Sequence, residues 1–409
     1  MSTVSHVRKP GFVITLGILT AMAAIAVDLS LPAIPGMVDA LATTLQIGQL
    51  IVGVFMAGLA CGQIPAGLLS DRLGRLPVLF GGMLLFAVGA VLAALATDID
   101  VMLAARFVQG MGAAAAIVLS RAIVRDIASG RDAAALMSIM TMIFTVAPVI
   151  APTVGAVIVS QWGWRAPFLT IALIGVAMLV TIRTQLVETH EPVAESHPLQ
   201  QLRDSFAEFC SHRQSVYGLL LLLLPPVGFM SIIAVSAGIV VDIYGFAITE
   251  FGLLFALLGA SLLVGSFLNR WLVSRLDGMQ LIALGAMLMG LASVQLIAIA
   301  ILDAAPFAWL WGCICTFMFS LAFTLPNSTV LALDPIPRIA GVGSSLLGTT
   351  QNLFGAAGAV IGAGMFDGSV RRSVLLMALA GIGTLAVFLL RPLLAPGPFT
   401  HPADELARD

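Results

Sequence analysis

Long apolar runs recur along the whole chain and constrain its fold more than any other feature. A helix needs about 20 consecutive, mostly apolar residues to cross the hydrocarbon core of a bilayer. The sequence contains twelve such runs, and polar stretches between them hold most of the charged residues. They lie at approximately 11–32, 45–69, 77–97, 101–124, 134–160, 166–186, 214–241, 248–272, 280–302, 307–333, 339–365 and 373–394. The pattern predicts an all-α integral membrane protein with twelve transmembrane helices.

The composition agrees with a membrane protein and argues against a nucleic-acid partner. The chain is 60% hydrophobic and 10% charged, with a mean hydropathy of +1.08, whereas soluble domains are about 25% charged. A soluble fold of this composition would lack the polar surface that keeps a protein in solution, so we expect the lipid bilayer to surround it. The net charge is −2 and the arginines are dispersed, which predicts no nucleic-acid binding.

The residues that usually carry catalysis or bind metals do not form a suitable pattern. All five histidines lie in polar stretches or at the edge of an apolar run, and three of the four cysteines lie inside apolar runs. Lys9 is the only lysine, so a Gly-Lys-Ser/Thr phosphate loop is impossible. We therefore expect no enzymatic activity, no catalytic residues, no metal site and no cofactor.

The longest polar segment divides the chain into two halves of six spans each. We predict an N-terminal six-helix bundle at 1–187, a cytoplasmic linker with a surface helix at 188–212, and a C-terminal six-helix bundle at 213–409. A weak internal repeat supports this division, because Gly67-x-x-x-Asp71-Arg72 and Gly265-x-x-x-Asn269-Arg270 end the second span of each half. Repeated halves are a common architecture of secondary transporters.

The placement of arginine and lysine predicts how the chain is oriented in the membrane. With the N-terminus inside, fifteen of these residues lie on the cytoplasmic side, and only Arg165, Arg371 and Arg372 lie outside. Positive charge is concentrated on the cytoplasmic side of membrane proteins. Both termini are therefore expected in the cytoplasm.

Two charges, Asp28 and Arg106, lie within apolar runs, where a charge is costly and is normally retained for a function. At a rise of about 1.5 Å per residue, both fall at a similar depth in the outer half of the membrane. An arginine neighbour and desolvation shift an aspartate pKa in opposite directions, so a conformational change could load or release a proton. We expect Asp28, Arg106 and Gln109, which shares a helical face with Arg106, to couple protons to transport. Alternatively, Arg106 extends to the outer interface.

The turn between the second and third spans carries the most specific motif. It reads Gly67-Leu-Leu-Ser-Asp71-Arg72-Leu-Gly74-Arg75. By charge alone it could be an ordinary cytoplasmic turn, but the full pattern resembles the Gly-x-Leu-x-Asp-Arg-x-Gly-Arg signature of the major facilitator superfamily. The resemblance implies the major facilitator fold of two six-helix bundles, with this turn as a cytoplasmic gate. The equivalent turn at Asn269 has lost the acid and the second glycine, which weakens a similar role there.

Span 5 contains Pro148, Pro152 and Gly155 on one helical face. Two prolines inside a span bend it, so one interpretation is a purely structural kink. The segment also resembles the Gly-Pro-x-x-Gly-Gly motif of antiporters in this superfamily, with Ala151 and Ala156 in place of two glycines. This resemblance favours export over uptake.

The end of the first span narrows the resemblance further. Asp28-Leu-Ser-Leu-Pro32-Ala-Ile-Pro35 resembles the Asp-x-Tyr-Leu-Pro-Ala-x-Pro pattern of the bicyclomycin/chloramphenicol-resistance (Bcr/CflA) subfamily, with Ser30 in place of the tyrosine. The resemblance implies a proton-driven antiporter that exports small amphipathic drugs across a bacterial inner membrane. We expect a monomer. The alternatives are a proton symporter that imports a small metabolite, and a membrane sensor that does not transport.

The substrate site is harder to infer from the sequence. Pro225 and Pro226 are expected to break the seventh span, and interrupted helices often line transporter sites. The polar and aromatic residues in the middle of C-terminal spans are candidates for substrate contacts, although helix packing is the more common role of such residues. These candidates are Phe229, Met230, Ser231, Phe255, Phe317, Gln351 and Asn352.

Overall fold

The computed structural model describes residues 10–128, 130–190, 198–302, 306–336 and 339–395. This part of the chain is helical and contains no β-strand. Both termini, which we predicted to be cytoplasmic, and residues 191–197 of the predicted linker lie outside the described residues.

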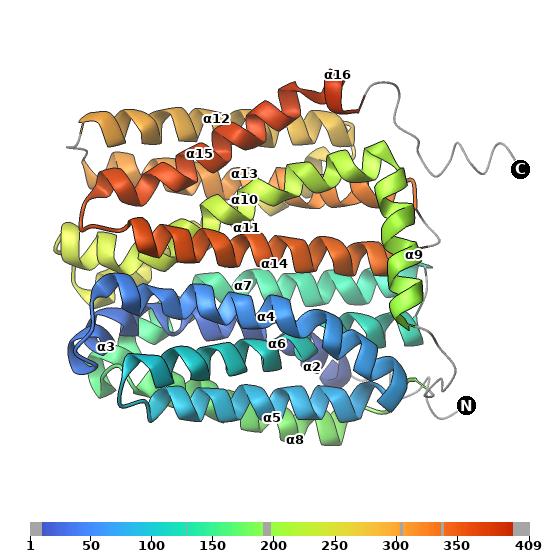
Figure 1. The fold of residues 1–409 in the computed structure, drawn as a ribbon, viewed down its shortest axis with the longest axis horizontal. Coiled ribbons are helices and arrows are strands. Elements are labelled where there is room, and N and C mark those ends of the chain that lie inside the picture. The colour runs from blue at the N-terminus through green and yellow to red at the C-terminus, as the bar shows by residue number, and fades with distance from the viewer. Residues whose placement is uncertain (1–9, 129, 191–197, 303–305, 337–338, 396–409) are drawn as a thin grey trace, which may run out of the picture. The chain divides into compact units, whose positions relative to one another are not determined.

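Each of the twelve predicted spans corresponds to one long helix (Figure 1). These helices are α2 (Pro10–Asp28), α4 (Leu45–Leu73), α5 (Arg75–Ala94), α6 (Ile99–Ile127), α7 (Gly130–Trp162), α8 (Ala166–Gln185), α10 (Arg213–Ala237), α11 (Ile248–Leu272), α12 (Gly278–Leu302), α13 (Phe307–Leu333), α14 (Ala340–Met365) and α15 (Val370–Leu389). The shorter elements are η1 (Leu31–Ala33), α3 (Ile34–Ala40), α9 (Pro198–Ser211), η2 (Gly238–Ile243) and α16 (Arg391–Leu394).

Within the described residues, eleven helical segments are both long and apolar enough to cross a membrane. Helix α14 is also long, but the polar run from Thr349 to Asn352 interrupts its apolar sequence. The predicted fold class, an all-α protein with membrane-spanning helices, agrees with these helices.

Polar side chains fix where several of these helices begin. The Thr44 hydroxyl accepts a hydrogen bond from the Ile47 N–H at 3.4 Å, and the Asp98 carboxylate accepts one from the Val101 N–H at 2.9 Å. Ser369 caps α15 in the same way. Each cap satisfies a backbone donor that the first helical turn leaves without a partner.

Prolines make the structure differ from the predicted spans at both ends of the chain. The first span was predicted at 11–32, but α2 ends at Asp28 and the spanning segment continues through η1 and α3 as Gly11–Ala40. Pro32 and Pro35 have no N–H to donate and therefore interrupt the helical hydrogen bonds there. Asp28 consequently lies at the break in this segment. The last span, predicted at 373–394, ends at Leu389, before the separate short helix that contains Pro392.

The prediction that Pro225 and Pro226 break span 7 is wrong. Helix α10 continues through both prolines to Ala237 and is followed by a π-helical segment, η2. Neighbouring helices can compensate for the lost backbone hydrogen bonds of a proline inside a membrane helix. The irregular backbone of this span therefore lies more than ten residues after the proline pair.

The described helices form two compact units. The first comprises residues 1–196 and 236–259, and the second comprises residues 197–235 and 260–409. The divisions fall inside α10 and α11, so these two helices contribute to both units. The domain boundaries predicted from the sequence remain a prediction.

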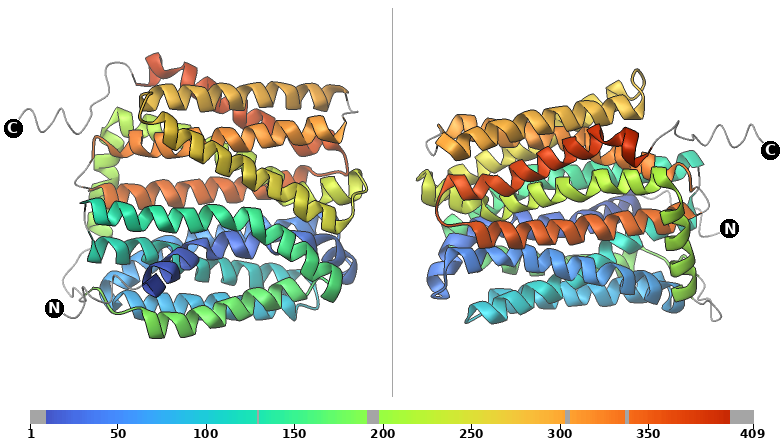
Figure 2. Two further views of the ribbon diagram at one scale, coloured as in Figure 1. Left: turned by 180° about the vertical axis from the view of Figure 1, so that it is seen from behind. Right: turned by 45° about the horizontal axis from the view of Figure 1, so that its top comes forward.

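In the first unit, α6 packs against α4 on one side and α5 on the other. Helix α8 packs on α5, and α2 packs on α7 and α6, as the two further views show (Figure 2). This arrangement surrounds α6 with helices, which explains why Arg106 and Gln109 on α6 are fully buried. The N-terminal candidates for proton coupling therefore lie inside the helix bundle.

In the second unit, α12 packs against α13 and α15. Helix α9, the one described helix of the predicted linker, inserts Phe209 into an apolar cluster with Leu222, Ala332 and Leu347. Arg203, Asp204 and Glu208 are exposed, so α9 is an amphipathic helix that is attached to this unit by its apolar face.

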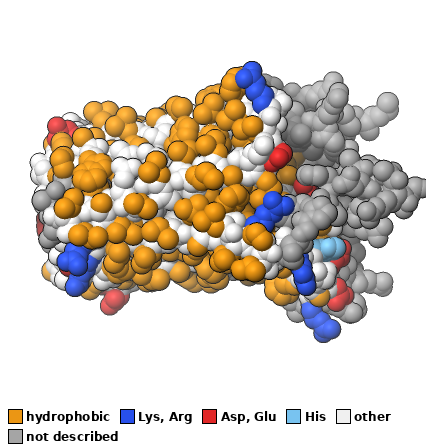
Figure 3. Space-filling view, turned by 90° about the horizontal axis from the view of Figure 1, so that it is seen from above, with side chains coloured by type: hydrophobic (Ala, Val, Ile, Leu, Met, Phe, Trp, Pro, Cys, Tyr) orange, Lys and Arg blue, Asp and Glu red, His pale blue; other side chains and the backbone are white. Residues whose placement is uncertain are grey.

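Apolar side chains cover the middle of the face drawn in Figure 3, and charged side chains gather towards its two ends. Exposed large apolar residues are found on many of the long helices, for example Leu173, Phe267 and Ile301. A surface of this kind is stable in lipid and would aggregate in water.

Candidate functional site

Arg106 lies at the centre of a polar cluster inside the first unit. Its side chain is 0% exposed. Its Nη1 donates hydrogen bonds to the Gln109 Oε1 at 2.7 Å and to the Ala26 carbonyl at 3.4 Å, and its Nε donates to the Ile51 carbonyl at 3.4 Å. The guanidinium thus joins α6 to α2 and α4 and does not extend to the surface.

Two aromatic rings complete the surroundings of Arg106. The guanidinium carbon lies 4.5 Å from the centre of the Phe55 ring and 5.8 Å from that of Phe168. Aromatic faces attract a cation, and they do so without neutralising its charge. The Nη2 of Arg106 and the Nε2 of Gln109 have no hydrogen-bond partner among the described residues. The cluster therefore holds a buried cation with spare donors.

Asp28 ends α2, two residues after Ala26, whose carbonyl accepts from Arg106. It is 6% exposed. Within the described residues, no hydrogen bond or ion pair involves its carboxylate, and Arg106 is not within ion-pair distance. The structure thus brings Arg106 and Gln109 into direct contact and places Asp28 at the end of the neighbouring helix α2, with no contact between its carboxylate and Arg106.

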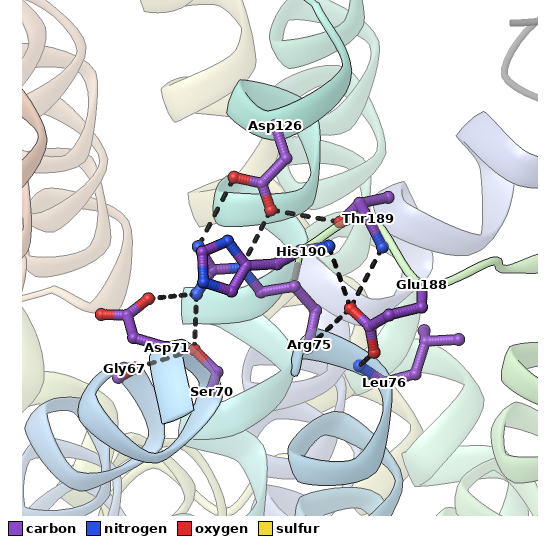
Figure 4. A network of polar contacts seen from close by, with 9 residues as sticks. All are labelled: Gly67, Ser70, Asp71, Arg75, Leu76, Asp126, Glu188, Thr189 and His190. Carbon is purple, nitrogen blue, oxygen red and sulfur yellow. Dashed lines mark hydrogen bonds and ion pairs between the residues drawn. The ribbon is translucent and has the colours of Figure 1, made fainter. Parts of the chain in front are cut away.

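The second polar cluster is the turn between α4 and α5, in which Arg75 is the central residue (Figure 4). Its Nη1 donates to the Ser70 hydroxyl at 2.8 Å and to the Asp71 carboxylate at 2.5 Å, and its Nε donates to Asp126 at 2.9 Å. Asp126 belongs to the end of α6 and also accepts from the Thr189 hydroxyl at 3.1 Å. Arg75 thus fastens the ends of α4, α5 and α6 together.

Glu188, in the segment that follows α8, completes this turn (Figure 4). Its carboxylate accepts hydrogen bonds from the N–H groups of Arg75 at 2.8 Å and Leu76 at 3.0 Å, at the start of α5. It also accepts from the N–H groups of Thr189 and His190. Burial raises the pKa of the Glu188 carboxyl, but the four backbone hydrogen bonds lower it more, so the pKa lies below its ordinary value. Glu188 therefore acts as a negatively charged cap of α5.

The predicted gating residues contribute unequally to this network. Gly74 has a φ of +92°, which only glycine adopts without strain, and a Cβ there would lie 2.8 Å from the Glu188 carboxylate. Asp71 and Arg75 are joined directly. Arg72 is exposed and forms no ion pair within the described residues, and Gly67 contributes only its carbonyl, which accepts from Ser70.

The matching turn of the second unit has Asn269 at the position of Asp71. The Asn327 amide of α13 donates to the Asn269 Oδ1 at 2.8 Å and to the Phe323 carbonyl at 2.7 Å. The Arg275 guanidinium lies 3.7 Å from the centre of the Trp271 ring. The second turn thus replaces the carboxylates of the first with amides and an aromatic ring.

The residues of the antiporter-like motif lie in α7 at its contacts with other helices. Pro148 and Pro152 lie inside the helix. Gly155 packs against the backbone of Leu29, the residue after Asp28. The Thr153 hydroxyl donates to the Gly252 carbonyl of α11 at 2.9 Å, within the first unit. The motif segment therefore contacts both the end of α2 and the start of α11.

The candidate substrate residues are divided between the two units. Phe255 lies in the first unit and packs against Phe251, with 5.6 Å between ring centres. In the second unit, Ser231 donates to the Gly228 carbonyl and Phe317 is fully buried against Gly228. The remaining candidates are half-buried, namely Phe229, Met230, Gln351 and Asn352. Their role in substrate binding remains a prediction.

Sequence reasoning missed several residues that the structure adds to these clusters. Glu188 caps a helix that begins 113 residues earlier, and no local pattern reveals such a contact. Phe55 and Phe168 appear in the sequence as ordinary apolar residues. Gln49 is fully buried with neither amide atom paired among the described residues. Its place in an apolar run was the one signal that could have identified it.

The comparisons with known proteins agree with this architecture. The model of the Major Facilitator Superfamily matches residues 16–359. The bicyclomycin resistance protein homolog of Haemophilus influenzae is 27% identical over 385 residues, which are 93% of this chain and 96% of the relative. The multidrug resistance protein MdtL of Shewanella oneidensis is 30% identical over 340 residues, which are 81% and 83% of the two chains. The crystal structure of a D-xylose-proton symporter has the same fold, with a TM-score of 0.75, 16% identity and coverage of 93% and 97%.

The helices, the buried charges and these relatives define a multi-pass membrane transporter. The chain belongs to the major facilitator superfamily. The membership predicted from the Gly67–Arg75 turn is thereby confirmed, and the names of the relatives agree with the Bcr/CflA subfamily. This is a family of transporters, which fits the expectation that the chain is not an enzyme.

Proposed function

We propose that this protein exports small amphipathic drugs or metabolites in exchange for protons, by alternating access, as a monomer in the inner membrane of a bacterium. The relatives named for resistance to bicyclomycin, chloramphenicol and multiple drugs support export of this kind of substrate. The antiporter-like segment of α7 supports exchange. The excess of positive charge on one side of the predicted membrane supports cytoplasmic termini.

The observation that carries the proposal is the buried Asp28 carboxyl at the end of α2, the helix whose Ala26 carbonyl accepts a hydrogen bond from Arg106. A carboxylate that is removed from water without a partner is costly, so a small change in its surroundings is enough to add or remove its proton. Arg106 contacts the backbone of α2 at Ala26 and can approach or withdraw from Asp28 when α2 and α6 move. Gln109 keeps its hydrogen bond to the guanidinium while Arg106 approaches or withdraws from Asp28.

The turn centred on Arg75 has a different proposed role, as the cytoplasmic gate. Its ion pairs with Asp71 and Asp126 join three helices at one end of the first unit. Both ion pairs share the Arg75 guanidinium, so they remain intact or break together when the gate opens. We assign Gly67, Asp71, Arg72, Gly74 and Arg75 to this gate.

Inverted membrane vesicles with an acidic interior test the function directly. The protein should accumulate bicyclomycin inside these vesicles as protons leave, and Asp28→Asn should abolish the accumulation. Asn is nearly isosteric with Asp and cannot carry the proton. Asp39→Asn, an exposed acid on α3, is the matched control and should transport like the parent.

The direction of flux separates the competing functions. Drug that leaves the vesicles together with protons would indicate a symporter. A panel of amphipathic compounds that produces neither drug flux nor proton movement would indicate a sensor. Normal proton-driven accumulation in Asp28→Asn would contradict the role of this carboxyl.

A further inference from the structure

Gly155 of α7 touches the backbone of Leu29, the residue that follows Asp28. A Cβ at position 155 would lie 3.1 Å from the carbonyl carbon and the Cα of Leu29, and still closer to its carbonyl oxygen. These are backbone atoms, which cannot rotate away as the end of a flexible side chain can. Only glycine permits α7 to approach the end of α2 this closely.

The backbone after Asp28 is held firmly against this contact. Leu29 and Ser30 are buried, and the Ser30 hydroxyl donates to the Val27 carbonyl at 2.8 Å. The N–H of Leu29 donates to the Ile25 carbonyl at 3.0 Å. A displacement of Leu29 must therefore move the adjoining residue, Asp28, relative to the Arg106 cluster.

Helix α7 is also fastened on its other side. Two residues before Gly155, the Thr153 hydroxyl donates to the Gly252 carbonyl of α11 at 2.9 Å. Pro148 and Pro152 lie in the preceding turns and each remove one backbone hydrogen bond from α7. This part of the helix is thus easy to bend, and its contacts join α11 to the end of α2.

We propose that Gly155 is a positioning residue for Asp28, and that α7 transmits the position of α11 to this carboxyl. The inference rests on the proposed function only in taking Asp28 as the proton carrier. The contact fixes the α2 backbone at Leu29, and this contact determines how deeply Asp28 lies among its apolar neighbours. A movement of α7 against α11 then changes how readily Asp28 takes up a proton.

Labelling with dicyclohexylcarbodiimide tests this without any transport assay. The reagent reacts with protonated carboxyl groups in apolar surroundings, and mass spectrometry of the full-length protein measures the modification of Asp28. The midpoint of labelling against pH reports the proton affinity of Asp28. Gly155→Ala should move this midpoint by at least about 0.5 pH unit, a threefold change in proton affinity. Asp28→Asn should not be labelled at this position.

Two glycine variants distinguish positioning from loss of packing. Gly112→Ala on α6 is similarly crowded, because a Cβ there would lie 2.8 Å from the Phe86 Cα. It should lower the Tm without moving the labelling midpoint. Gly81→Ala has no atom within 4 Å of the new Cβ and should change neither quantity.

Thr153→Val keeps the proposal testable if Gly155→Ala does not fold. Valine keeps the shape of threonine and removes only the hydrogen bond to Gly252, so a smaller midpoint shift is expected. An unchanged midpoint in each folded variant of Gly155 and Thr153 overturns the proposal. A shifted midpoint in Gly155→Ala, together with normal coupling in Asp28→Asn, supports the positioning role and contradicts the proposed function.

Discussion

Two buried arginines of the first unit have opposite surroundings. Arg75 is 8% exposed and is surrounded by two carboxylates and a hydroxyl that accept its hydrogen bonds. Arg106 is fully buried, and its partners are an amide, two backbone carbonyls and two aromatic rings. One of its nitrogens has no partner among the described residues. The first charge is neutralised locally and the second is not.

This difference indicates different roles for the two arginines. A guanidinium between carboxylates stabilises one arrangement of helices, because separating the charges leaves each of them partly buried and unpaired. A guanidinium among neutral groups keeps its charge unneutralised, so it can still attract a carboxylate such as Asp28 when the helices move. We therefore associate Arg75 with the structure of the gate and Arg106 with the movement of protons.

The largest effect on stability is expected from Arg75→Ala. The variant leaves Asp71 and Asp126 without their cation, and removing one member of a partly buried pair should cost about 2–4 kcal/mol. Thermal unfolding of the purified protein in detergent measures this as a lower Tm. Arg372→Ala is the control, because its ion pair with Asp367 is exposed and should contribute less than about 1 kcal/mol. Equal losses in the two variants would contradict the assignment of Arg75.

Arg106→Met should separate function from stability. Methionine fills a similar volume, and no carboxylate within ion-pair distance loses its partner. The buried Gln109 amide oxygen loses its donor, so the unfolding free energy should fall by about 1–2 kcal/mol, less than in Arg75→Ala. Proton-driven export should nevertheless fall at least tenfold, measured as drug accumulation in inverted vesicles. A destabilisation as large as that of Arg75→Ala would show that Arg106 is structural.

Glu188→Gln should change how stability depends on pH. The pKa of Glu188 lies below its ordinary value in the folded protein, so its contribution is present above about pH 4.3 and is lost as the pH falls through the lower folded value. The Tm of the parent should therefore contain a decrease below about pH 4 that the variant lacks. Glu208→Gln, an exposed acid on α9, is the control and should retain this decrease.

A smaller loss of stability than that of Arg75→Ala is expected in the turn of the second unit that begins at Asn269. Asn327→Leu removes the hydrogen bonds to Asn269 and Phe323, which together should cost about 1–2 kcal/mol. Because no ion pair is involved, the loss in Tm should be the same at low and high salt. The loss caused by Arg75→Ala should instead become smaller as salt rises, since salt weakens the exposed side of its network.

Much of the fold could be predicted from the sequence, because an apolar run long enough to span a bilayer has few alternatives to a helix. The same reasoning failed at the prolines. The pair at Pro225 and Pro226 is accommodated inside α10, whereas Pro32 and Pro35 end a helix. Local propensity cannot distinguish these cases, since the outcome depends on how the neighbouring helices pack.

The candidate site was predictable only in part, for a similar reason. Asp28, Arg106 and Arg75 are identifiable because a charge at membrane depth or in a specific motif is unusual. Their partners come from other helices, and a contact such as that between Glu188 and the start of α5 spans more than a hundred residues. The shared helical face of Arg106 and Gln109 was visible because it is local.

Proton release on drug binding is the most direct test of the central claim that Asp28 carries the transported proton. Bicyclomycin is added to the purified protein in weakly buffered detergent at a pH near the labelling midpoint of Asp28, and a pH indicator measures the released protons. The parent should release up to about one proton for each bound drug molecule, and Asp28→Asn should bind the drug without release. Equal proton release from the parent and from Asp28→Asn would contradict the claim.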